Sequence, residues 1–265
     1  MTKRHYHSGL TERERAEKVG EAHAYQVLNE HFGSDVFIGS SIEIKLHELS
    51  HVIYRDVDDE KYQGATVTYT TGEVFVVLNT HLPLRTRYFT ATHELWHVLK
   101  IKDMINNEID EERAADRFAA ALMMPEPLVR SLWDNLVKDI EPEKAVIMIA
   151  DMSSAPYEAV ARRVFELDLP NASERMKNYK EQEWIAFRQR FNLPESPLDR
   201  PLPFVSFAKY AESIENEIAK GELDHIQGAT KLANSSIEKA KELQAKAMDK
   251  MRAASSDDEE EEDKG

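Results

Sequence analysis

The feature that most constrains this chain is the spacing of its histidines. The pattern His-Glu-x-x-His occurs twice, at residues 47–51 and again at residues 93–97. Side chains four residues apart share one face of a helix, so both imidazoles of such a motif can reach one Zn²⁺ ion beside the glutamate. Because the chain has no cysteine, any metal site has to use histidine and carboxylate ligands. At least one helix is therefore expected to carry a zinc site.

The flanking residues separate the two copies. A zinc helix is packed inside the protein, and the second copy has uncharged neighbours, with Thr90 to Thr92 before it and Leu95 and Trp96 within it. The first copy follows Lys45 and runs directly into the strand-like residues 52–54. We therefore predict that His93 and His97 are metal ligands, that Glu94 is the catalytic carboxylate, and that the first copy is accidental.

A catalytic zinc site needs a third protein ligand and an open position for water. A second helix is expected after His97, with Asp110 as its N-cap and with Glu112 fifteen residues beyond His97. Glu112 in its first turn is the predicted third ligand, and Glu111 remains the alternative. Asp116, one turn later, can accept a hydrogen bond from a ligand histidine and fix its tautomer.

Composition and charge exclude several classes of protein. The 265 residues are 42% hydrophobic and 31% charged, which is typical of a folded globular chain. The net charge of −15 argues against a general DNA-binding surface, which needs clustered lysine and arginine. No secretory signal and no apolar run of about 18 residues is present. We expect a cytoplasmic protein with no membrane contact and no direct nucleic-acid contact.

The apolar pattern predicts an α+β fold with a small, mostly antiparallel sheet. Residues 42–51 are ambiguous between helix and strand. Strands are expected at 52–57, 64–70 and 74–79, and helices at 11–32, 87–100, 110–124, 127–138, 142–168, 172–191, 204–220 and 227–253. We divide the chain into a domain at 1–169, a helical region at 170–254 and a disordered acidic tail at 255–265.

Two of these segments carry a family resemblance. Residues 89–97 (FTATHELWH) and 112–125 (ERAADRFAAALMMP) resemble the ImmA/IrrE family of metallopeptidases, with its patterns FTxAHELGH and ExxAN-x-FAAxLLMP. Residues 149–153 and 159–163 look like the helix-turn-helix-like stretch of that family. The resemblance covers about residues 15–169. Trp96 stands where the family usually has glycine, and Asp116 where asparagine is common.

The resemblance implies a zincin-like core and a specific substrate. Members of this family typically cut a helix-turn-helix transcriptional repressor of the XRE type, in a DNA-damage, stress or mobile-element response. In the expected mechanism Zn²⁺ is held by His93, His97 and Glu112, and Glu94 acts as general base in amide hydrolysis. Tyr88, His81 and Arg87 are near in sequence as oxyanion donors, and none is assigned.

Two other functions compete with the protease. The chain can be a zinc-stabilised regulatory module that does not cut its partner, although a closed structural site has no use for Glu94. It can also be a transcription factor that binds DNA through residues 149–165, which the acidic balance disfavours. The cleavage site, the activating signal, the oligomeric state and the role of residues 170–265 are not defined by the sequence.

Overall fold

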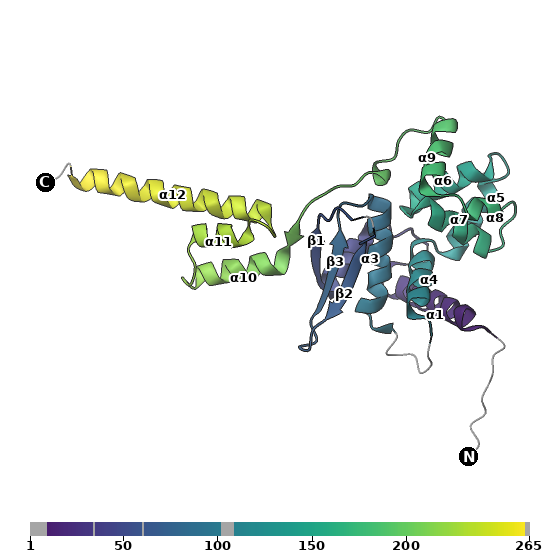
Figure 1. The fold of residues 1–265 in the computed structure, drawn as a ribbon, viewed down its shortest axis with the longest axis horizontal. Coiled ribbons are helices and arrows are strands. Elements are labelled where there is room, and N and C mark those ends of the chain that lie inside the picture. Colours follow the sequence, from purple (N-terminus) through teal and green to yellow (C-terminus); the bar gives the residue numbers. More distant parts are fainter. Residues whose placement is uncertain (1–9, 34, 60, 102–108, 263–265) are drawn as a thin grey trace, which may run out of the picture.

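A computed structural model describes the chain except for residues 1–9, 34, 60, 102–108 and 263–265, and except for the side chains beyond Arg252. The fold is α+β and largely helical (Figure 1). Its elements in chain order are α1 (Glu12–Val27) continued by a π-helical turn (Leu28–Phe32), α2 (Ser41–Leu49), β1 (His51–Arg55), β2 (Gly64–Thr68), β3 (Val74–Asn79), α3 (Leu84–Val98), α4 (Glu111–Met123), α5 (Glu126–Leu136), α6 (Pro142–Ser153), α7 (Tyr157–Glu166), α8 (Glu174–Lys177), α9 (Glu181–Arg190), β4 (Ser206–Phe207), α10 (Ala208–Ala219), α11 (His225–Leu232) and α12 (Ile237–Glu262).

The four strands form one sheet in the order β2-β3-β1-β4. β2 pairs antiparallel with β3, and the short β4 pairs antiparallel with β1. The central pair β1 and β3 is parallel, with Val52 opposite Val76 and Tyr54 opposite Leu78. The expectation of a small, mostly antiparallel sheet is confirmed, and the parallel central pair is an addition that strand composition does not reveal.

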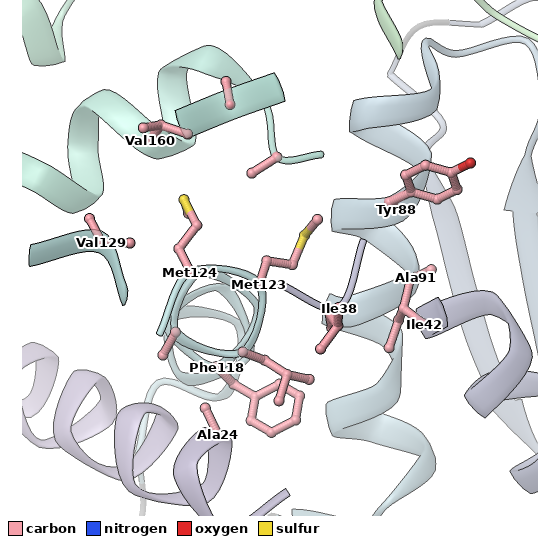
Figure 2. Packing of buried hydrophobic residues seen from close by; sticks show 14 of the residues in the cluster. Ala24, Ile38, Ile42, Tyr88, Ala91, Phe118, Met123, Met124, Val129 and Val160 are labelled. Atoms are coloured by element: carbon pink, nitrogen blue, oxygen red, sulfur yellow. The ribbon is translucent and has the colours of Figure 1, made fainter. Parts of the chain in front are cut away.

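Helix α4 lies in the centre of the core, between α1 and α3 (Figure 2). Figure 2 shows Phe118 on the side of Ala24, and Met124 on the side of Val129 and Val160. α1 approaches α4 very closely at Gly20, where an added Cβ would lie 2.3 Å from the carbonyl oxygen of Ala114. Glycine is therefore required at this helix crossing.

Several predicted helices are divided in the structure. The ambiguous segment 42–51 is a helix as far as Leu49 and a strand from His51. The helix expected over 142–168 is two helices, because Ser154 takes a left-handed conformation (φ 59°) and Pro156 follows it. Similarly, 227–253 divides into α11 and α12. α12 continues through residue 262, over most of the segment expected to be disordered, since alanine and glutamate favour helix.

The buried core continues past residue 169. Met176 and Trp184 are 1% and 0% exposed and belong to the same core as the helices α1, α3 and α4. They are the apolar anchors of an otherwise polar segment, so residues 170–198 pack with the first 169 residues. The helices α10 to α12 lie apart from the other helices (Figure 1) and have a separate small core. Within the described residues, no helix is long and apolar enough to cross a membrane.

Arg85, at the start of α3, ties these segments together. Its guanidinium is 2% exposed and forms ion pairs with Asp151 of α6 and, at 2.5 Å, with Asp199 in the connector after α9. It also donates to the carbonyl oxygens of Ala150 and Ala155. The helix that carries the second His-Glu-x-x-His motif is thereby fixed to the α6–α7 turn and to the connector.

Replacing Arg85 by methionine is expected to lower the free energy of unfolding by about 3–5 kcal/mol, because the partly buried carboxylates and the two carbonyl oxygens that it binds lose a buried cationic donor. Urea denaturation followed by circular dichroism measures the change. Arg13→Met removes an exposed pair with Glu17 on α1 and serves as the control, with no measurable effect expected. Equal effects of the two substitutions would contradict the role given to Arg85.

A carboxyl pair joins the first turns of α7 and α9. The backbone N–H of Glu181 donates to Glu158 at 3.0 Å, and that of Glu158 donates to Glu181 at 3.4 Å. Burial raises the pKa of Glu181 to about 7, and the negative charge of Glu158 adds to the rise against the opposing backbone hydrogen bond. The folded protein therefore holds a proton at Glu181 that the unfolded chain releases near pH 4.5.

Because the folded pKa is raised, the stabilising contribution is present below about pH 4.5 and is lost as the pH rises through 7. Glu181→Gln is expected to unfold like the parent at pH 4 and to be more stable by about 1–3 kcal/mol at pH 8. Thermal unfolding of both proteins across this range tests it. A constant difference between the two proteins at all pH values would refute the assignment.

Candidate metal centre

Helix α3 presents the second histidine motif to the first turn of α4. The helix is uncharged between Tyr88 and His93 and packs on the sheet, with Thr90, Ala91 and Thr92 buried. His93 and His97, four residues apart, lie side by side with ring centroids 5.3 Å apart. Their Nε2 atoms are 3.4 Å from each other. The local geometry is the one expected of this motif on a helix.

Glu112 completes a cluster of three ligands. Its carboxylate oxygens lie 3.4 Å from His93 Nε2 and 3.8 Å from His97 Nε2. The three donor atoms all lie within 4.8 Å of one another, and no other group of histidine and carboxylate side chains in the described parts of the chain meets this condition. Because the Glu112 side chain is 75% exposed, the cluster opens to solvent on one side.

Carboxylates of α4 hold the outer nitrogen of each ring. Asp116 Oδ1 is 3.0 Å from His93 Nδ1, and Glu111 Oε1 is 3.5 Å from His97 Nδ1. This arrangement places the protons on Nδ1 and leaves both Nε2 lone pairs for a metal. Asp116 lies against His93 Nδ1, at the position that the prediction requires of an orienting carboxylate. It places Glu111 behind His97 and outside the three-ligand cluster, so Glu112 is the better placed of the two carboxylates.

The protonation of His93 reflects these neighbours. Burial lowers its pKa, but the hydrogen bond with Asp116 and the charges of Asp116, Glu94 and Glu112 outweigh this effect, so the pKa lies above its usual value. The surroundings of His93 thus favour a positive charge. A divalent cation supplies that charge in place of a proton, and metal binding competes with protonation at this ring.

The side chain of Glu94 points from α3 toward the edge strand β2. It is 6% exposed, and its Oε2 accepts a hydrogen bond of 2.7 Å from the Thr66 hydroxyl. β2 can approach this closely because residue 64 is glycine, where an added Cβ would lie 2.7 Å from Thr90 Cγ2 and 3.5 Å from Glu94 Oε1. The catalytic carboxylate predicted from the motif is thus held in a fixed position.

The first histidine motif does not form a comparable site. α2 ends at Leu49, and Ser50 is extended (φ −152°), so His47 and His51 do not share a helical face. His47 contacts the Tyr54 hydroxyl at 3.2 Å, and His51 lies 3.0 Å from Lys209 Nζ. The geometry agrees with the interpretation of this copy as accidental.

Trp96 packs in the core and leaves the metal centre unobstructed. It is fully buried, with its ring 5.6 Å from Phe118 and 6.0 Å from His23 between centroids. The indole replaces glycine on the side of α3 that faces α1 and α4. Its Nε1 has no hydrogen-bond partner among the residues that the structure describes.

The candidate oxyanion donors named from the sequence are engaged elsewhere. Arg87 pairs with Glu43 at 2.8 Å, and His81 pairs with Asp56 at 2.8 Å. Tyr88 is 8% exposed and packs in the core beside Ala91 (Figure 2). Sequence reasoning missed Thr66 and also Tyr62, whose pKa is raised by burial and by the charge of Glu94. No spacing rule connects either residue to the motif, because their loop and strand lie about 30 positions before it.

The helix-turn-helix-like stretch has few basic side chains that could bind DNA phosphates. Residues 149–165 contain two basic residues, Arg162 and Arg163. Arg163 is fully buried and forms hydrogen bonds of 2.7 and 2.6 Å with Glu21 of α1. Asp151, in the same stretch, is held by Arg85 and Arg188. These residues hold the core together, and Arg162 alone remains of the basic residues for a phosphate.

The donor set fits a zinc ion. Two imidazole nitrogens and one carboxylate oxygen, with one open side and a buried glutamate adjacent, define the metal centre of a His-Glu-x-x-His metallopeptidase-type domain. Residues 50–165 match the model of the IrrE N-terminal-like domain, peptidase family M78. This match supports the resemblance of the domain to the ImmA/IrrE family.

Other comparisons add little. A Mycobacterium tuberculosis transcriptional regulator of known structure is similar at 13% sequence identity and a TM-score of 0.43. The similarity covers 62% of this chain, and this chain spans 54% of the regulator. No curated protein matches this chain.

We expect zinc binding to depend on the second motif alone. His93→Ala or His97→Ala removes a ligand and should abolish stoichiometric zinc, and Asp116→Ala should weaken binding about 10–100-fold because one ring loses its orienting carboxylate. Chelator competition and elemental analysis give the affinity and the content. The double substitution of His47 and His51 by alanine is the matched control. Loss of zinc in that control would contradict the assignment.

Proposed function

We propose that this chain is a zinc-dependent endopeptidase that cleaves a helix-turn-helix transcriptional repressor of the XRE type, in the cytoplasm, as part of a stress, DNA-damage or mobile-element response. The observation that carries the proposal is the position of Glu94. A buried carboxylate beside an open three-ligand site is what amide hydrolysis requires and what a purely structural zinc site does not.

The residues around the centre suit this chemistry. His93, His97 and Glu112 would hold the ion, which when bound acts as a Lewis acid toward the scissile carbonyl and raises the acidity of water. Glu94 takes a proton from the attacking water and passes it to the leaving amine. Thr66 holds Glu94, and Asp116 and Glu111 hold the two imidazoles.

The substrate proposal rests on the family resemblance and on charge. DNA-binding repressors present basic surfaces, and this chain has a net charge of −15. Opposite charges of this kind speed the encounter of two proteins and favour the correct partner. The same charge works against a direct role on DNA.

Glu94→Gln is expected to keep stoichiometric zinc and to lose cleavage, with a fall in rate of at least about 10²-fold, since the amide cannot accept the proton from water. Glu48→Gln, the same substitution in the first motif, is the control and should cleave normally. Mass spectrometry of new protein termini in cells that express each variant, with and without DNA damage, identifies the substrate and tests catalysis together.

The outcomes separate the hypotheses. A cut in one helix-turn-helix repressor that depends on Glu94 supports the whole proposal. A Glu94-dependent cut in a different protein supports the proposed hydrolysis and refutes the proposed substrate. Zinc binding without any cut that depends on Glu94 refutes the protease and favours a regulatory module that binds its partner without cleavage.

A further inference from the structure

The three C-terminal helices carry an apolar groove that the metal centre does not use. α11 and α12 line it, with Ala229 and Ala233 on one side and Ala240 and Ala247 on the other. The larger side chains Ile226, Ile237 and Met248 stand along the same groove and are 47%, 46% and 53% exposed. Small residues on both walls leave room for another helix to lie between them.

The unit that carries this groove has a very small core of its own. Ala211, Ile214, Leu232 and Leu243 are the buried members of its apolar cluster. A unit with so few buried apolar residues is rarely stable unless more apolar surface is buried. Covering the exposed side chains of Ile226, Ile237 and Met248 would supply this additional buried surface.

α12 has the shape to cover the groove of another copy. It is 26 residues long, about 39 Å at 1.5 Å per residue, and it extends well past α10 and α11 (Figure 1). Ile237, Gln244 and Met251 recur at seven-residue spacing, with Lys241 and Met248 between them, so they form one face. Such a face pairs with its own copy when two helices cross in register.

Charge selects the orientation of such a pair. Residues 237–252 hold five basic and three acidic residues, whereas residues 253–262 hold six acidic residues and no basic one. A parallel pair would place the two acidic ends together. An antiparallel pair places each acidic end along the lysine-bearing first half of the other helix. Lys239 and Lys241 are held by exposed carboxylates of their own chain, which exchange partners at little cost.

We infer that two copies of this chain associate through the α11–α12 groove, with the α12 helices antiparallel and Met248 of each copy beside Met251 of the other. The contact is isologous, so one surface serves both copies. It is independent of the metal centre and of any peptidase activity. Residues 257–262 of each α12 thereby lie along the lysine-bearing half of the other copy's helix.

Analytical ultracentrifugation of the full chain tests the association. We expect a dimer in the micromolar range that Met248→Asp dissociates at least 100-fold more readily, because the carboxylate enters an apolar contact. Ile44→Asp, at a residue on α2 that is 64% exposed, is the control and should leave the dimer intact. A monomer at all concentrations overturns the inference, as does equal dissociation by both variants.

Charge and orientation are tested separately. Lys239→Glu with Lys241→Glu should weaken the dimer at low salt, and adding Glu259→Lys with Glu261→Lys should restore it.

Because the chain has no cysteine, single introduced cysteines report the orientation of the two helices. A short bifunctional maleimide should link two copies that carry Met248→Cys. It should leave two copies that carry Ile237→Cys unlinked, because antiparallel helices hold the two cysteines about 37 Å apart. Linking at both positions would show a parallel pair and overturn the inference.

Discussion

The contact between α3 and α4 is the constraint on which the metal centre depends. α3 provides His93, Glu94 and His97, and α4 provides Glu112 and both carboxylates that orient the imidazoles. The ligands converge only if the two helix axes stay close, and the buried alanines of α4 permit this. α1 presses on the opposite side of α4 at Gly20. The geometry of the site is therefore a property of helix packing as much as of the motif.

Buried ion pairs fix the surroundings of these two helices. Glu21 of α1 binds Arg117 of α4 and the fully buried Arg163 of α7, and burial raises its pKa less than the two arginines lower it. Arg85 performs the same function between α3, α6 and the connector after α9. Such pairs add little net stability, but each is costly to break, so they specify one arrangement of the helices.

The sequence predicts the parts of the site that follow helical spacing. His93, His97, Glu112 and Asp116 were all predicted from residues four positions apart, and the structure brings them together. Asp110 was correctly expected as the N-cap of α4. Thr66 and Tyr62 could not be found this way, because Thr66 reaches Glu94 from β2 and Tyr62 lies in the loop before that strand. The parallel pairing of β1 with β3 was missed since valine-rich strands suit either direction. Trp184 and Met176 extend the core beyond residue 169, where the surrounding sequence is polar.

Gly64 makes the candidate metal centre depend on a residue that lies outside its motif. With no side chain at this position, β2 lies against α3 and Thr66 reaches Glu94. Any larger residue would have to push the strand away and would release the glutamate from its hydrogen bond. Two related chains could thus share every ligand and the full His-Glu-x-x-His sequence while differing in their ability to orient the base. In this chain the position of Glu94 therefore depends on a glycine about thirty positions before the motif as well as on the motif itself.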